Sequence, residues 1–146
     1  MQFDNNNVVV KLCAEGMLLE GQGKDNEARD LFNKAWTLAT NDFEKFTAAH
    51  YVARHQDSVE EKLKWDKQAL THALKLDSDD TSNVLPSLYL NIAKCYEDLN
   101  KPIQAQENYQ TGLTFVKSDS DDGYSKMIKS GLKAGLARLQ ATVDKK

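Results

Sequence analysis

Three histidines, His50, His55 and His72, are the side chains best suited to bind a metal ion or move a proton. His50 and His55 are five positions apart, whereas pairs that bind a metal from one helix are spaced about four apart. His72 falls in a different predicted helix. The spacing therefore predicts no metal site. We expect His50 to pack in the core and His55 to lie at a helix end, where the dipole favours a cation.

Two polar segments look like ligand-binding loops. Residues 21–24, Gly-Gln-Gly-Lys, look like part of a phosphate-binding loop, but the earlier glycine and the following Ser or Thr of such a loop are missing. The two glycines therefore indicate the end of a helix. Residues 118–123 begin like a calcium loop, yet Lys129 stands where the closing glutamate belongs. That segment is typical of an acidic lead-in to a basic helix.

The pattern does not predict an enzyme. Cys13 and Cys95 are far apart in apolar helical segments, which predicts buried, reduced thiols and a cytoplasmic location. No spacing of Ser, Cys, His and Asp suggests a nucleophile with its base. No strand followed by a glycine-rich turn is predicted, so no cofactor is expected.

Charge and hydropathy narrow the range of partners. The net charge is −3 and the pI about 5.6, which offers no general attraction for nucleic acid or an anionic membrane. No apolar run reaches the ~18 residues of a membrane span, and the polar start is unlike a signal peptide. We therefore expect neither nucleic acid nor membrane as a partner.

Hydrophobic residues recur with helical periodicity along the whole chain. Asp25 is expected to cap the second helix, Ser58 with Glu61 reads as a capping box, and Pro86 suits a first turn. The pattern predicts an all-α fold with seven helices, at about 8–19, 25–38, 42–56, 58–76, 86–99, 103–116 and 124–143.

A small–aromatic–small skeleton appears twice among these helices, as Ala28, Phe32 and Ala35 and again as Ala105, Tyr109 and Gly112. Recurrence of this kind is typical of stacked helical hairpins. The last helix carries Gly131 and Gly135, which allow a neighbour to approach closely. The polar residues expected on its outer face are Lys126, Lys129, Lys133 and Arg138.

These residues resemble the tetratricopeptide repeat family, in which Ala93, Tyr96, Ala105, Tyr109 and Gly112 match the small and aromatic positions. The first copy matches with Leu12, Gly16, Leu19, Ala28, Phe32 and Ala35. The resemblance implies one domain, 1–146: a right-handed stack of three antiparallel hairpins at about 8–40, 42–77 and 84–117. A capping helix at about 122–143 would close the stack.

The middle copy departs from the family pattern at Lys62 and Asp66, and two registers remain open for it. One interpretation is a functional buried polar cluster of His50 with Asp66. The other is a degenerate repeat whose longer fourth helix places Trp65 in the core.

The family's concave groove implies a non-enzymatic module that binds a protein or peptide. Carried over by position, the groove residues are Val10, Cys13, Met17, Glu20, Thr47, Tyr51, Arg54, His55, Leu90, Lys94 and Glu97. An alternative is a self-associating dimer that uses the apolar end near Val10 and Met17 or an edge of the last helix. Small bacterial proteins of similar appearance sometimes carry a methyltransferase label, which this sequence does not support.

Overall fold

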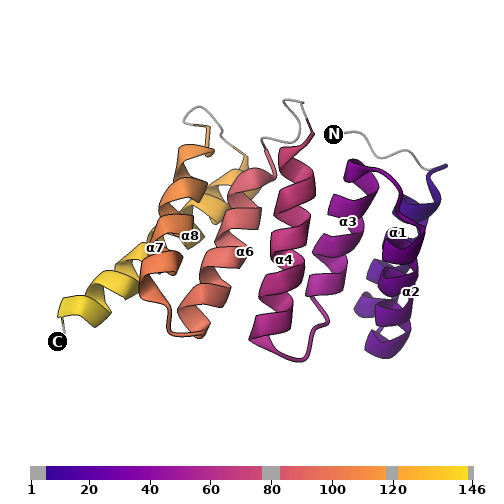
Figure 1. Cartoon of the computed structure of the whole chain (residues 1–146), viewed down its shortest axis with the longest axis horizontal. Coiled ribbons are helices and arrows are strands. Elements are labelled where there is room, and N and C mark those ends of the chain that lie inside the picture. The colour runs from indigo at the N-terminus through magenta and orange to yellow at the C-terminus, as the bar shows by residue number, and fades with distance from the viewer. Residues whose placement is uncertain (1–5, 77–82, 118–121, 145–146) are drawn as a thin grey trace. The chain divides into compact units, whose positions relative to one another are not determined.

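The computed structural model describes residues 6–76, 83–117 and 122–144 (Figure 1). Over these residues the chain forms seven α-helices and no strand, which confirms the all-α prediction. None of the described helices combines the length and the hydrophobicity needed to cross a bilayer. The chain divides into two compact units, Met1–Asp77 and Ser78–Lys146.

The first unit holds four helices in two pairs (Figure 1). α1 (Val8–Gly21) packs against α2 (Asp25–Leu38), and α3 (Asp42–Ala53) packs against α4 (Val59–Leu74). α3 also contacts α1 and α2, so the two pairs share one core. Ala28, Phe32 and Ala35 of the predicted skeleton are fully buried in it.

Gly16 on α1 is required by the ring of Phe32. A Cβ atom at Gly16 would lie 2.4 Å from the ring atom Cε1 of Phe32, closer than real Cβ atoms come to a neighbour. The missing side chain therefore lets α1 and α2 approach closely.

Side chains of the residues before α1, α3 and α4 cap these helices. Asn7 accepts from the Val10 amide at 3.1 Å, Asn41 from the Glu44 amide at 2.9 Å, and Ser58 from the Glu61 amide at 3.1 Å. The Ser58 cap was predicted and is confirmed. The prediction for Asp25 was wrong: this residue is already the first of α2 and follows Gly23, whose φ is +77°.

α4 is the longest helix of the first unit, with 16 residues, and it places Trp65 against the core. The ring of Trp65 meets that of Trp36 edge-on, with centroids 5.0 Å apart. Trp65 is partly buried against the core cluster that contains Phe32. Of the two interpretations of the middle segment, this packing bears only on the expected placement of Trp65, which lies against the core.

The second unit is a three-helix assembly of α6 (Leu85–Asp98), α7 (Pro102–Thr114) and α8 (Gly123–Asp144) (Figure 1). α6 and α7 pack together, and α8 contacts both. Their shared core is formed by Ala93, Ala105, Tyr109, Ile128 and Leu132.

Glycines let α8 lie directly on its neighbours, as the sequence predicts. A Cβ atom at Gly135 would lie 2.2 Å from Cζ of Tyr109, and one at Gly131 would lie 3.2 Å from a terminal carbon of Leu90. Tyr109 is fully buried beneath this contact. The last helix is thus part of the second unit's core.

Turn chemistry fixes the ends of these helices. Asn100 adopts a left-handed φ of 60° between α6 and α7, a conformation that asparagine tolerates better than most residues. Pro86 and Pro102 lie in first turns, where the missing amide proton costs little. Asp122 accepts from the Ser125 amide at 2.7 Å, while the calcium-like residues 118–121 lie outside the described chain.

Candidate functional site

An aromatic side chain on α3 lies at the centre of the candidate site in the first unit. Tyr51 is half-buried, and its ring stacks on the buried Phe32 ring with centroids 5.1 Å apart and planes 15° apart. The guanidinium carbon of Arg54 lies 5.5 Å from the Tyr51 ring centroid on the same helix end. A rigid aromatic face is therefore bordered by a cation.

Glu20, at the end of α1, contacts two side chains at the C-terminal end of α3, Arg54 and His55. Its Oε1 lies 3.2 Å from an Arg54 guanidinium nitrogen, and its Oε2 lies 2.6 Å from Nε2 of His55. The His55 ring stacks on Phe32 with centroids 5.5 Å apart. One carboxylate thus fixes both residues just after the C-terminal end of α3, where the helix dipole also favours the Arg54 cation.

We call this surface the Tyr51 patch and define it by Met17, Glu20, Tyr51, Arg54 and His55. Met17 lies on the same helix as Glu20 and is 46% exposed, and the Arg54 side chain is also 46% exposed. Burial raises the pKa of the Tyr51 hydroxyl, which therefore stays protonated. The patch offers hydrogen-bond donors, an aromatic face and an adaptable thioether, which suit noncovalent binding.

Three predicted groove residues of the first unit are instead part of its core, so this part of the prediction was wrong. Val10 is 9% exposed, Cys13 3% and Thr47 5%. α3 covers the face of α1 that was expected to be open. The Thr47 hydroxyl donates to the Phe43 carbonyl at 2.8 Å, and burial raises the pKa of the Cys13 thiol to about 12. Both cysteines are buried and reduced, as predicted.

In the second unit, α8 covers two of the three predicted groove residues. Leu90 packs against the core that α8 completes, next to Gly131. Glu97 accepts hydrogen bonds from Arg138 and Tyr109. Lys94 pairs with Asp98 on its own helix. The prediction of an open surface at Leu90 and Glu97 was therefore wrong, because α8 lies there.

Arg138 is exposed on α8, as expected. Its guanidinium also binds Glu97 on α6, a contact that the sequence did not predict. Lys126, Lys129 and Lys133 are exposed, as expected. Arg138 and Glu97 are separated by 41 positions, and no local pattern links two residues that far apart.

A buried charge lies next to His50 in the first unit. Asp66 is 3% exposed, and its Oδ2 lies 2.6 Å from Nζ of Lys62, one turn earlier on α4. Nδ1 of His50 is buried and makes no hydrogen bond with any described residue. Burial lowers the pKa of His50, although the nearby Asp66 acts in the opposite direction.

The histidines do not converge on a metal. His55 contacts Glu20, and Nδ1 of His72 lies 2.8 Å from Asp42. Within residues 6–76, 83–117 and 122–144, no group of three or more His, Cys, Asp or Glu side chains is arranged to hold a metal ion.

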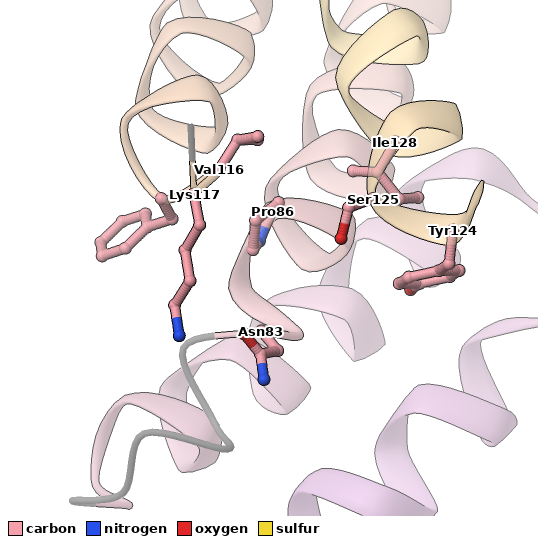
Figure 2. A pocket seen from close by; sticks show the side chains of 8 residues that line it. Asn83, Pro86, Val116, Lys117, Tyr124, Ser125 and Ile128 are labelled. Atoms are coloured by element: carbon pink, nitrogen blue, oxygen red, sulfur yellow. The ribbon is translucent and has the colours of Figure 1, made fainter. Parts of the chain in front are cut away.

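A small pocket lies in the second unit where α6 begins, α7 ends and α8 begins (Figure 2). Figure 2 shows Lys117 and Asn83 with the α8 residues Ser125 and Ile128 around it. Its cavity volume of ≈ 20 Å³ is near the least that holds one water molecule. This pocket is therefore too small to hold a peptide or a cofactor.

The sequence matches no known protein family, no curated protein and no solved structure.

Proposed function

We propose that this chain is a non-enzymatic module that binds a peptide or protein segment through the Tyr51 patch. The observation that carries the proposal is the Tyr51 ring, which is stacked on buried Phe32 while the exposed guanidinium of Arg54 lies over it. Tyrosine and arginine are the residues most enriched among those that dominate binding energy at protein interfaces.

The patch is held in place before any partner arrives. Phe32 supports both Tyr51 and His55, and Glu20 restrains both Arg54 and His55. A site whose side chains are already ordered loses less conformational entropy on binding. Since Glu20 uses part of the Arg54 guanidinium, the remaining N–H donors are left to bind a carbonyl or carboxylate of the partner.

The tetratricopeptide-like arrangement is part of the same proposal. Helices pair in chain order within each unit, and the matched residues Ala28, Phe32, Ala105 and Tyr109 are fully buried. These facts support a stack of three hairpins closed by α8. The buried, reduced thiols are compatible with the cytoplasmic location that we also propose.

To test the proposal, the full chain is used to select binding peptides from a displayed library of random sequences. The affinity of the chain for each selected peptide is then measured by titration. The variant Tyr51→Leu/Arg54→Gln keeps an apolar group on Phe32 but removes the ring and the charge. We expect its affinity for the selected peptides to fall at least tenfold, which is about 1.4 kcal/mol.

The matched control is Tyr124→Leu/Lys129→Gln, which likewise replaces a tyrosine by leucine and a cation by glutamine, at exposed positions on α8. It is expected to bind the peptides like the unmodified chain. Circular dichroism establishes that both variants are folded. Peptides bound equally by the two double variants would rule out the Tyr51 patch as the binding site.

A further inference from the structure

The aromatic and cationic groups of the Tyr51 patch lead from the core of the first unit to its surface. The Tyr51 ring stacks on the fully buried Phe32 ring, with centroids 5.1 Å apart. The guanidinium carbon of Arg54 lies over the Tyr51 ring, 5.5 Å from its centroid. Since 46% of the Arg54 side chain is exposed, the group that a partner meets first is a guanidinium backed by an aromatic ring.

The guanidinium of Arg54 has two kinds of binding surface. The N–H groups at its edge donate hydrogen bonds to oxygen atoms, and its flat faces lie against aromatic rings. Glu20 already takes part of the edge, because its Oε1 lies 3.2 Å from an Arg54 nitrogen. The Tyr51 ring shows that the guanidinium also binds through its π-contact. A ring of the partner makes the same kind of contact from the exposed side.

The charges of the patch favour an uncharged partner group. Glu20 and Arg54 carry opposite charges, and Nε2 of His55 lies 2.6 Å from the other oxygen of the Glu20 carboxylate. A carboxylate of the partner at Arg54 would be repelled by Glu20, and a cation at Glu20 would be repelled by Arg54. A neutral aromatic side chain meets neither repulsion.

Met17 adds the same preference from α1. It lies one turn before Glu20, on the same face of the helix, and is 46% exposed. A thioether makes favourable contacts with the edges of aromatic rings. The ring of Tyr51, the guanidinium of Arg54 and the sulfur of Met17 are therefore three groups that each attract an aromatic ring.

We infer that the partner segment binds the Tyr51 patch through an aromatic side chain, which lies against the Arg54 guanidinium and contacts Tyr51 and Met17. A backbone carbonyl beside this aromatic anchor accepts a hydrogen bond from the N–H groups of Arg54 that Glu20 leaves available. The inference rests on the proposed function, because it names the kind of residue by which the bound peptide is recognised.

The experiment uses the peptides that the full chain selects from the displayed library. Each residue of a selected peptide is replaced by alanine to find its anchor, which we expect to be Phe, Tyr or Trp. The anchor is then exchanged, in one pair of peptides, between phenylalanine and cyclohexylalanine, which has a similar shape but no π-electrons. The unmodified chain should bind the phenylalanine peptide about three- to tenfold more tightly. Arg54→Met, which lacks the guanidinium, should bind the two peptides within about twofold of each other.

Arg29→Met is the matched control, because the Arg29 side chain is 40% exposed in the same unit and pairs with Asp57 outside the Tyr51 patch. It should keep the full preference for the phenylalanine peptide. An aliphatic or charged anchor overturns the inference, and so does equal binding of the two peptides by the unmodified chain. A preference that survives Arg54→Met, or one that Arg29→Met abolishes equally, overturns it as well.

These failures differ from a failure of the proposed function. If the anchor is not aromatic but Tyr51→Leu/Arg54→Gln still weakens binding, the patch binds peptides and only the inference is wrong. If that double variant binds the selected peptides as well as the unmodified chain does, the proposed function and the inference are both wrong.

Discussion

Arg138 on α8 binds Glu97 on α6 through two hydrogen bonds, Nε to Oε2 at 2.8 Å and a terminal nitrogen to Oε1 at 3.0 Å. The hydroxyl of Tyr109 on α7 donates to the same Oε1 at 2.6 Å. One carboxylate therefore joins all three helices of the second unit. This geometry makes α8 a structural partner of α6 and α7 through polar contacts as well as through its apolar face.

Removing the guanidinium should loosen α8. We expect Arg138→Met to lower the free energy of unfolding by about 1–2 kcal/mol, since Glu97 then keeps only the Tyr109 hydroxyl and the pair is partly exposed to solvent. Urea denaturation measures the loss. The control Lys129→Met, at an exposed position of the same helix, should change stability by less than about 0.5 kcal/mol. Equal losses in the two variants would contradict the role given to Arg138.

Stability should also depend on pH through Glu97. The hydrogen bonds from Arg138 are the largest cause that lowers the pKa of Glu97 below its ordinary 4.5. A carboxyl whose pKa is lower in the folded chain contributes its full stabilisation above 4.5 and loses it as the pH falls through the folded pKa. Between about pH 5.5 and 3, the unmodified chain should therefore lose more stability than Glu97→Gln. Parallel curves for the two proteins would show that the pKa is not lowered.

Much of the fold could be predicted because its signals are local. Helical periodicity, the Ser58 cap, Pro86 and the small residues Gly16 and Gly135 each act within a turn or at one contact. Their local geometry fixes where helices begin, end and approach one another. That is why the all-α class and the position of the last helix agree with the structure.

The site was harder to predict, because the exposure of a side chain depends on which residues from distant parts of the sequence pack against it. The residues Val10 and Cys13 match open positions in the repeat pattern, yet both are buried in the first unit. Arg138 follows the polar face of α8 in sequence but binds Glu97, 41 positions away. Tyr51 and Arg54 stay partly exposed even though the Tyr51 ring stacks on buried Phe32, a detail that periodicity does not encode.

Substitution by alanine should affect stability differently at Gly135 and at Gly131. At Gly135 the new Cβ would lie 2.2 Å from the ring of Tyr109, which is buried and cannot move aside. We expect Gly135→Ala to lower the free energy of unfolding by about 1–3 kcal/mol despite the better helix propensity of alanine. Thermal and urea denaturation measure the change.

Gly131→Ala is the matched control on the same helix. Its Cβ would lie 3.2 Å from the flexible end of Leu90, so a small shift of that side chain accommodates it. The gain in helix propensity, about 1 kcal/mol, should then leave stability unchanged or raised. If Gly135→Ala were tolerated as well as Gly131→Ala, the close contact between α8 and the Tyr109 ring would be disproved.

His50 should make the first unit sensitive to mild acid. Burial is the largest cause that lowers its pKa from 6.5; Arg54 and Lys62 act in the same direction, and Asp66 opposes them. The folded chain therefore favours the neutral ring, while the unfolded chain takes up a proton below about 6.5. Stability from this group is complete above 6.5 and declines as the pH falls towards the folded pKa.

His50→Phe tests this directly, because phenylalanine keeps a ring beside Tyr51. The substitution also breaks no hydrogen bond at Nδ1 of His50, since that buried atom makes none with any described residue. We expect the variant to lose less stability than the unmodified chain between about pH 7.5 and 5.5 in urea denaturation. Tyr51→Phe, which keeps the ring contact and all three histidines, should retain the original pH dependence. If His50→Phe and the unmodified chain lost equal stability, protonation of His50 would not be coupled to unfolding. The pKa of His50 would then not be lowered in the folded chain.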